Sequence, residues 1–365
     1  MKTLFDQTTI KNLVIPNRFV RSATFEGIAS AEGAVTPALN DLMASLASGG
    51  TGLIISGHTY VRTDGQVSAK QLGVYSDGLI PGLKKMTEAV HAASGRIIMQ
   101  LAHAGRFASP KLTGQTALAV SQPQDTSDPS IREITMEDIR GLVAAYAQAA
   151  ARAKTAGFDG IQIHSAHGYL LSQFLSPAFN CRRDEYGGSV FNRSRIHREI
   201  IQAIRKSVGQ DYPILVKLNC QDFIENGLQL DDSLQAARIL ADTGVDAIEI
   251  SGGVVRTGKL EPSRTGINSI EKEAYFRYEA RHFRREIDIP LILVGGIRSY
   301  ELAQQLIENE EVDYISMSRP FIMEPELVNR WASGDHSKAL CKSDNACLKS
   351  GRQGNGVRCM VKLNQ

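Results

Sequence analysis

The sequence has few cysteines and little excess charge, and each shortage argues against a class of protein. Only five cysteines occur among 365 residues, and three of them lie near the C-terminal end. This number favours reduced thiols over a disulfide framework. The 41 basic and 39 acidic residues give a formal net charge of +2. Such a balance predicts no basic face for nucleic acid or for an anionic membrane surface.

Long apolar runs are also missing, although apolar residues make up 42% of the sequence. No run reaches the roughly 18 residues that a membrane-spanning helix needs. Residues 1–12 lack the apolar stretch of a secretory signal. We therefore expect a cytoplasmic enzyme that acts on a small molecule and has no nucleic-acid or membrane partner. Self-association into a homo-oligomer stays open.

Short strand signals alternate with amphipathic helix signals along most of the chain. The predicted strands are residues 18–24, 52–56, 96–101, 160–164, 214–218, 247–251, 291–294 and 314–318. Helix starts are indicated at Thr36, before Pro37, and at Thr135, which forms a capping box with Asp138. Eight strands alternating with helices favour an α/β fold, the (β/α)8 TIM barrel. A doubly wound sheet is the alternative, but no G-x-G-x-x-G follows the first strand.

We expect a single-domain barrel over residues 1–335, with a cysteine-containing tail, residues 336–365, packed on it. Alternation within the strands predicts that apolar side chains face the helices. Polar side chains such as Gln162 and Lys217 are expected to face the barrel interior. The connections after the third and fourth strands, residues 103–134 and 165–191, are longer than usual. Both are expected on the catalytic rim as a lid or substrate wall.

Polar residues and glycines collect where the strands end, which is where barrel enzymes carry their active sites. These residues are Thr24, His58, Gln100, His164, Lys217, Ser251, Gly252, Gly295, Gly296, Ser318 and Arg319. The last two strand ends suit a phosphate, because paired glycines admit close backbone approach and an arginine adds donors. The alternative is that Gly295 and Gly296 only make a tight turn.

Lys217 and the segment from His164 to Tyr169 each allow several readings. Lys217 in an apolar strand is consistent with a Schiff-base nucleophile, an anionic cofactor edge, or an ion pair with Glu249. His164 and His167 could both donate to one carbonyl oxygen, with Tyr169 supplying a proton. A shared metal is the rival for the histidine pair, although no third ligand is evident and we predict none. Simple packing is the remaining alternative.

Taken in order, these motifs resemble the old yellow enzyme family of FMN-dependent ene-reductases over nearly the whole chain. The matching stretches are residues 17–24, 52–55, 100–106, 164–177, 183–193, 294–296 and 318–320. The resemblance implies tightly bound FMN. The implied cofactor contacts are Ser22, Ala23, Thr24, His58, Gln100, Lys217, Ser251, Gly252, Gly295, Gly296, Ser318 and Arg319.

The resemblance also implies a reaction. NAD(P)H gives a hydride to the flavin N5, which passes it to the β-carbon of an α,β-unsaturated carbonyl or nitro compound. His164 and His167 are implied to hold the substrate oxygen, and Tyr169 to donate the proton. Two alternatives belong to other classes: a Schiff-base lyase that uses Lys217, and a catalytically idle barrel that binds flavin or a partner.

The tail is similar to the end of the barrel part of bacterial 2,4-dienoyl-CoA reductases, where Cys-x2-Cys-x3-Cys-x11-Cys holds an iron–sulfur cluster. Cys347 and Cys359 keep the eleven-residue gap, and Cys341 lies upstream. Asp344 stands in place of the second cysteine, and the interval from Asp344 to Cys347 is one residue short. Because a stable cluster usually has four ligands, we expect none here. We expect no FAD- or NADPH-binding domain of the kind that those longer reductases carry, so NAD(P)H is expected to meet FMN directly, unless a partner supplies electrons.

Overall fold

Eight parallel strands close into a barrel in the computed structural model, which describes residues 2–122, 128–258, 260–352 and 354–362. The barrel strands are β3 (Phe19–Arg21), β4 (Leu53–Ile55), β6 (Ile97–Ala102), β9 (Gly160–Ser165), β10 (Ile214–Asn219), β11 (Ala247–Ser251), β12 (Leu291–Val294) and β13 (Tyr314–Met317). Pairing of β13 with β3 and of β4 with β6 completes the ring. The predicted TIM barrel is confirmed, and β11 and β12 have the predicted bounds.

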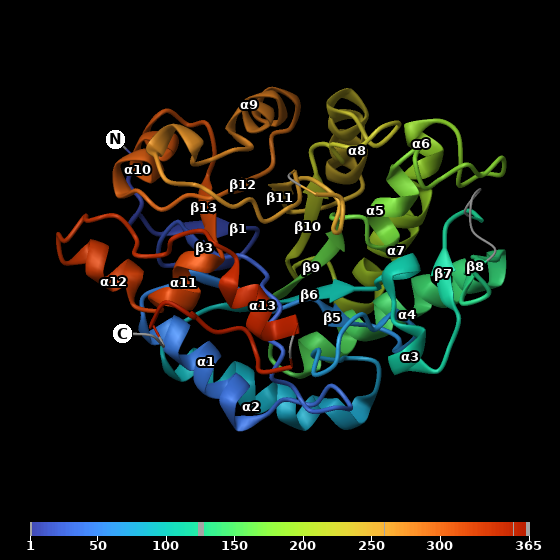
Figure 1. Cartoon of the computed structure of the whole chain (residues 1–365), viewed down its shortest axis with the longest axis horizontal. Helices are drawn as coiled ribbons and strands as arrows, with labels where there is room; N and C mark the ends of the chain where they lie inside the picture. The colour runs from blue at the N-terminus through green and yellow to red at the C-terminus, as the bar shows by residue number, and fades with distance from the viewer. Residues whose placement is uncertain (1, 123–127, 259, 353, 363–365) are drawn as a thin grey trace.

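Helices surround the strands on all sides in Figure 1. The longer ones are α1 (Pro37–Ser48), α2 (Ile80–Ala92), α4 (Met136–Thr155), α7 (Arg195–Val208), α8 (Leu230–Asp242), α9 (Arg277–Glu286) and α10 (Tyr300–Glu308). Thr36 caps α1 by accepting from the Leu39 amide, and Thr135 forms the predicted capping box with Asp138. Within the described part of the chain, no helix combines the length and apolarity needed to span a membrane.

Several short elements were not predicted. The strands among them are β1 (Thr8–Ile10), β2 (Leu13–Ile15), β5 (Thr59–Tyr60), β7 (Ala117–Ala119) and β8 (Ile131–Glu133). The helices are α3 (Pro110–Thr113), α5 (Leu170–Leu175), α6 (Val190–Arg193), α11 (Arg319–Met323), α12 (Leu327–Ala332) and α13 (Ala346–Arg352), with single 3₁₀ turns η1 (Thr63–Gly65), η2 (Asp77–Leu79), η3 (Gly105–Phe107) and η4 (Ile270–Lys272). The two long connections therefore carry structure of their own: η3, α3, β7 and β8 in the first, α5 and α6 in the second. Residues 123–127 of the first lie outside the described residues.

The barrel interior has an apolar layer beneath a polar one. The apolar layer consists of Ile10 and Ile15 from the β1–β2 hairpin with Val20, Leu53, Ile55, Ile98, Leu215, Ala247, Ile292 and Tyr314. The hairpin therefore closes the end of the barrel where the strands begin. Outward residues such as Val216 and Ile163 pack with the helices in the main core. The predicted assignment of strand faces is confirmed, and the polar inward residues lie nearer the strand ends.

Candidate active site

A hydrogen-bonded network centred on Glu249 fills the polar layer of the barrel. The Glu249 side chain is fully buried, and its Oε1 lies 2.8 Å from Lys217 Nζ. The network also contains Ser22 and Ser316, which donate to Oε1, and Gln162, which donates to Oε2. Gln100 extends it by donating to Gln162 Oε1 over 2.7 Å. Six of the eight barrel strands or their immediate ends contribute to this one cluster.

The Lys217–Glu249 pair decides between the three readings of the lysine. Burial raises the pKa of Glu249, but the Lys217 ammonium and the hydrogen bonds from Lys217, Ser22 and Gln162 together hold it below its ordinary value. Lys217 Nζ also donates to Ser22 Oγ over 2.9 Å. A Schiff-base nucleophile must be a neutral amine, whereas this lysine faces a buried carboxylate that favours the ammonium. The ion-pair reading is confirmed, and the lysine still lines a cavity.

The cavity above this network is lined by cations and hydroxyl groups. The charged lining residues are Lys217, Arg298 and Arg319, and the described lining contains no carboxylate. The serines are Ser22, Ser251, Ser263, Ser316, Ser318 and Ser343, and Ala23, His167 and Gly296 also line the space. Hydroxyl donors, together with cations of which only Lys217 is paired with a buried carboxylate of the described residues, suit a ligand with several oxygens and an anionic end. This donor set fits the ribityl phosphate and the electron-rich ring edge of FMN.

The phosphate-type end of the cavity lies at the last two strands. Gly296 has a φ of +75°, and a Cβ there would come within 2.9 Å of the Tyr275 ring, so a side chain is excluded. Arg319 Nη1 donates to Asn345 Oδ1 over 2.8 Å. Asn345, in the tail, is itself fixed by Ser263, which donates to Oδ1 over 2.9 Å. The tail therefore positions the arginine, a contribution that the sequence motifs did not reveal.

Arg298, Ser343 and Asn345 are the functional candidates that sequence reasoning missed. Arg298 is buried and donates to the backbone oxygens of Cys341 and Ile267, which joins the barrel to the tail. Arg298 follows the Gly-Gly turn after β12, so an arginine two residues past a phosphate-type turn was the available signal. Nothing in the local pattern marks Ser343, which lines the cavity, or Asn345, which contacts the lining residues Arg319 and Ser263, because both are brought there only by tertiary packing.

Three aromatic side chains form the wall at the end of β9. The ring centroid of His164 lies 5.1 Å from His167 and 5.0 Å from Tyr169. His58 comes from the loop after β4 and lies 5.7 Å from Tyr169. His167 has a left-handed φ of +65°, and its Nε2 lies 2.7 Å from Ser251 Oγ. The structure thus brings together the residues that the sequence singled out for substrate binding.

The protonation of this wall follows from its burial. Burial lowers the pKa of His164 well below its ordinary value, and the nearby His167, His58 and Lys217 lower it further. Burial and Lys217 also hold the pKa of His167 low, and burial alone takes that of His58 to about 4. Burial raises the pKa of Tyr169 to about 12. The imidazoles are therefore neutral and the phenol protonated near neutral pH.

Two polar atoms in and beside the wall have no partner among the described residues. His164 Nδ1 is buried and makes no hydrogen bond among the described residues, and the same holds for His58 Nε2. A buried polar atom without a partner costs free energy, so a ligand atom is the natural complement. Nowhere in the described ranges do three or more histidines, cysteines or acidic residues gather as metal ligands. The geometry thus favours hydrogen bonding to an oxygen over a shared metal.

Three other residues that we expect to contact the cofactor lie beside a neighbouring cleft or against packed side chains. Thr24 Oγ1 lies 2.7 Å from Ser318 Oγ and lines a neighbouring cleft with Phe25 and Cys359. A Cβ at Gly252 would meet Cys220, Phe223 and Phe276, so that glycine faces packed side chains. Gly295, with a φ of +148°, backs onto Tyr275 and Phe276. For Gly252 and Gly295 the close-packing role is visible, and their contact with a cofactor stays a prediction.

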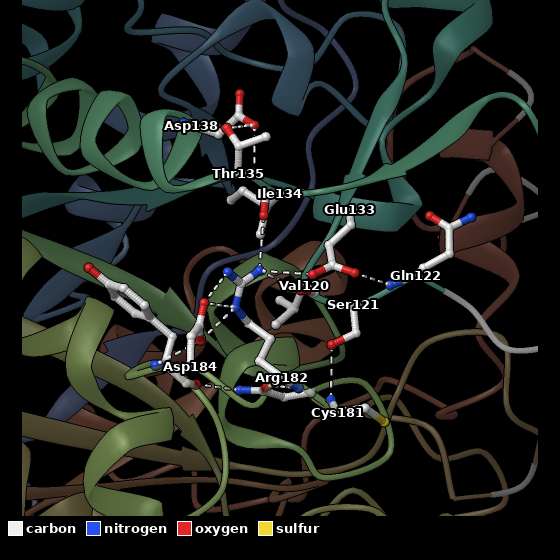
Figure 2. Close-up of polar contacts among 12 residues, drawn as sticks. Val120, Ser121, Gln122, Glu133, Ile134, Thr135, Asp138, Cys181, Arg182 and Asp184 are labelled. Carbon is white, nitrogen blue, oxygen red and sulfur yellow. Dashed lines mark hydrogen bonds and ion pairs between the residues drawn. The ribbon is translucent and has the colours of Figure 1, made fainter.

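A single arginine joins the two long rim loops, as Figure 2 shows. Arg182, from the loop after β9, has a side chain only 6% exposed and pairs with Asp184 and Glu133. Its Nη1 donates to the backbone oxygens of Val120 and Ile134, which flank β7 and β8. The Cys181 amide adds a bond to Ser121 Oγ. These contacts of Arg182 and Cys181 hold the two long loops together.

The tail cysteines gather around one small cavity. Cys341, Asp344, Cys347 and Cys359 all line it, together with Arg319 and Met323. All five cysteines are free thiols, and burial raises the pKa of Cys347 to about 11. The aspartate that stands in place of the second cysteine therefore lines the same cavity as the three tail cysteines. The expectation that these residues hold no iron–sulfur cluster stays a prediction.

The chain is similar in sequence to a family of flavin oxidoreductases and to several individual oxidoreductases. The profile of the family described as NADH:flavin oxidoreductase / NADH oxidase matches residues 3–337. An NADH oxidase of Thermoanaerobacter brockii is 36% identical over 98% of this chain and 55% of its own length. A 4,4'-dithiodibutanoate disulfide reductase of Rhodococcus erythropolis is 31% identical over 99% and 95%, respectively. An NADPH dehydrogenase of Listeria innocua is 35% identical over 89% and 93%. The chain thus spans about half the length of the first relative and most of the other two.

Solved structures show the same barrel. An old yellow enzyme homologue from Zymomonas mobilis superposes with a TM-score of 0.78 at 27% identity, covering 94% of this chain and 96% of that one. A 2-naphthoyl-CoA reductase superposes with a TM-score of 0.90 at 26% identity, covering 98% of this chain and 56% of the other. The fold and the expected family resemblance are both confirmed.

Glu249→Gln should destabilise the barrel strongly. The substitution preserves shape but leaves the Lys217 ammonium buried without a counter-charge, so we expect the free energy of unfolding to fall by about 3–5 kcal/mol. Chemical denaturation measures this. The exposed Glu88→Gln is the control, with an expected change below about 1 kcal/mol. A Lys217→Met/Glu249→Leu double variant should recover part of the loss. An unchanged Glu249→Gln protein would contradict the central role of the pair.

Arg182→Met should separate the two rim loops. The variant leaves the carbonyls of Val120 and Ile134 without their donor, so we expect a loss of about 1–3 kcal/mol in local stability. Limited proteolysis should then cut within residues 115–135 faster than in the parent. Arg183→Met is the matched control, because Arg183 is the exposed neighbour and makes none of these contacts. Equal cleavage rates in both variants would show that Arg182 does not hold the loops together.

Proposed function

Because the chain belongs to the NADH:flavin oxidoreductase / NADH oxidase family, we propose that it binds FMN tightly and reduces α,β-unsaturated carbonyl or nitro compounds with NAD(P)H. One observation carries the proposal. The cavity lined by Lys217, Arg298 and Arg319 reaches His167, which belongs to the wall of neutral imidazoles and a protonated phenol. An anion-binding cleft thus adjoins a set of groups suited to a carbonyl oxygen.

Different residues around the cavity would contact different parts of the cofactor. Ser318, Arg319 and Gly296 would hold the phosphate, and Lys217 with Ser22 would hold the polar edge of the ring. Bound FMN supplies the exchange of a hydride between the nicotinamide and the substrate. The fixed positive charge of Lys217 favours extra electron density at that edge. Its position is set by Glu249 beneath, so the charge is pre-organised.

The imidazoles act on the substrate as neutral donors. Because burial keeps the pKa values of His164 and His167 low, these rings hold a carbonyl oxygen by hydrogen bonds without protonating it. Withdrawing electron density through that oxygen makes the β-carbon more electrophilic. Tyr169, whose pKa of about 12 keeps its hydroxyl protonated, would give a proton to the α-carbon.

The competing readings have less support. Lys217 is engaged with Glu249 and Ser22, which disfavours lyase chemistry at its amine. An idle barrel would not need unpartnered buried nitrogen atoms at His58 and His164. We further propose a cytoplasmic location, where NAD(P)H is supplied and free thiols stay reduced.

The absorption spectrum tests the function directly. We expect the purified protein to be yellow, to lose its colour on anaerobic addition of NADPH or NADH, and to recover it on addition of 2-cyclohexenone. A colourless protein that takes up no FMN contradicts the cofactor assignment. Bleaching that 2-cyclohexenone does not reverse contradicts the proposed substrate class.

A His164→Ala/His167→Ala double variant tests the substrate oxygen site. It should keep FMN, because neither ring contributes to the phosphate-type end of the cavity, and its flavin is reduced with dithionite before the enone is added. Recovery of colour with 2-cyclohexenone should slow by at least about 100-fold, the usual cost of removing an oxyanion donor. The exposed pair His91→Ala/His336→Ala is the control. Enone reduction at the parental rate would refute the assigned roles.

A further inference from the structure

The backbone of the loop after β11 is hydrogen-bonded to the backbone of His167, a residue of the aromatic wall at the end of β9. Val254 forms an isolated parallel bridge with His167, and the Val255 amide donates to the His167 oxygen over 3.1 Å. Thr257 Oγ1 donates back to the Val254 oxygen over 2.6 Å. Arg256 lies between these anchors. Its main chain is therefore held beside the residue proposed to bind the substrate oxygen.

The Arg256 side chain lies against the same wall. Its guanidinium carbon is 5.7 Å from the centroid of the Phe107 ring. That ring borders Gly168, since a Cβ there would come within 3.1 Å of Phe107 Cε2. Phe107 and Tyr169 also pack on one small cluster of buried alanines. Arg256 thus carries a positive charge beside Tyr169, where it opposes the rise that burial causes in the Tyr169 pKa.

The donors of Arg256 are free among the described residues. The side chain is exposed, and it makes neither an ion pair nor a hydrogen bond in the described ranges. Its backbone adopts a left-handed φ of +67°, a costly conformation for a residue other than glycine. An arginine whose only contact among the described residues is a cation–π interaction keeps its planar fork available for two oxygens of an anion.

The surroundings of the wall carry one sign of charge. The charged or titratable groups that act on His58, His164, His167 and Tyr169 are Lys217, Arg256 and the histidines themselves. No carboxylate of the described residues is among them; Glu249 is paired with Lys217, and Glu261, in the same loop as Arg256, accepts from the Gly258 amide. A cleft lined by positive groups attracts anions and concentrates them. Arg256 is the exposed member of this set.

We propose that Arg256 binds an anionic group, a carboxylate or a phosphate, on the molecule that lies against His164, His167 and Tyr169. This inference rests on the proposed function and adds to it that NAD(P)H and the oxidising substrate occupy the same place in turn. Two sources share the chemistry: the phosphates of NAD(P)H, and a carboxylate on the substrate remote from its double bond. Arg256 is therefore a residue that determines specificity for anionic molecules bound against the aromatic wall.

Arg256→Gln separates these sources when the two half-reactions are followed by stopped-flow absorbance. The first arm reduces the FMN-loaded variant with NADH and with NADPH. The second reoxidises it with 2-cyclohexenone and with a cyclohexenone that carries a carboxylate substituent. We expect the apparent Kd of at least one anionic reactant to rise about 10–100-fold, which is the range for a lost charge-assisted hydrogen bond. Neutral 2-cyclohexenone should change by less than about twofold.

The pattern of losses identifies the anion. A larger loss with NADPH than with NADH points to the 2′-phosphate, and equal losses point to the diphosphate. A loss confined to the carboxylate-bearing enone points to the substrate. Calorimetric binding of NADP⁺ to the oxidised protein gives a readout that does not require turnover. Unchanged affinity for every anionic reactant would overturn the proposal.

Three variants complete the design. Arg285→Gln removes the same charge from the exposed C-terminal end of α9 and should leave all constants unchanged. Arg256→Lys should restore part of the affinity, and Arg256→Glu should weaken anion binding further. Similar losses in Arg285→Gln and Arg256→Gln would indicate general steering and would also overturn the proposal. Parent protein that NADPH bleaches but 2-cyclohexenone does not reoxidise refutes the proposed function, while the NADPH arm still decides the role of Arg256.

Discussion

The buried ion pair between Lys217 and Glu249 is the constraint on which the rest of the site depends. A carboxylate with no solvent contact is tolerated only when every oxygen lone pair is used, and Glu249 accepts from Lys217, Ser22, Ser316 and Gln162. Satisfying that demand fixes side chains from strands on opposite sides of the barrel. The geometry of the cavity floor follows from it.

The two layers of the barrel interior have different roles, because the apolar layer contributes stability and the polar layer contributes charge to the site. The apolar layer, closed by Ile10 and Ile15, supplies burial and excludes water from below. Because water cannot approach from that end, the electrostatic interactions of the polar layer act in a low dielectric. Lys217 therefore presents a fixed charge to the cavity from a rigid strand. A mobile surface lysine would lose much of this effect to solvent.

Local patterns predicted the barrel and much of its rim, since alternation within a strand decides which residues face inward. The β1–β2 hairpin and the β7–β8 pair have strands of three residues, too short to show alternation. The role of Lys217 stayed open among three readings because spacing gives no register. Only the pairing of β10 with β11 places Lys217 directly opposite Glu249. Asn345 lies 26 residues from Arg319, and no local pattern encodes that contact.

The tail has a structural role that does not depend on its cysteines. Arg319 lines both the cation-rich cavity and the cysteine cavity, so one side chain borders both spaces. Asn345 holds that arginine, and Arg298 binds the Cys341 oxygen from the other side. Removing the tail would free two arginines beside the phosphate-type turn and raise the entropic cost of ordering them around an anion. The segment that carries the cysteine cavity therefore holds two arginines at the edge of the cation-rich cavity.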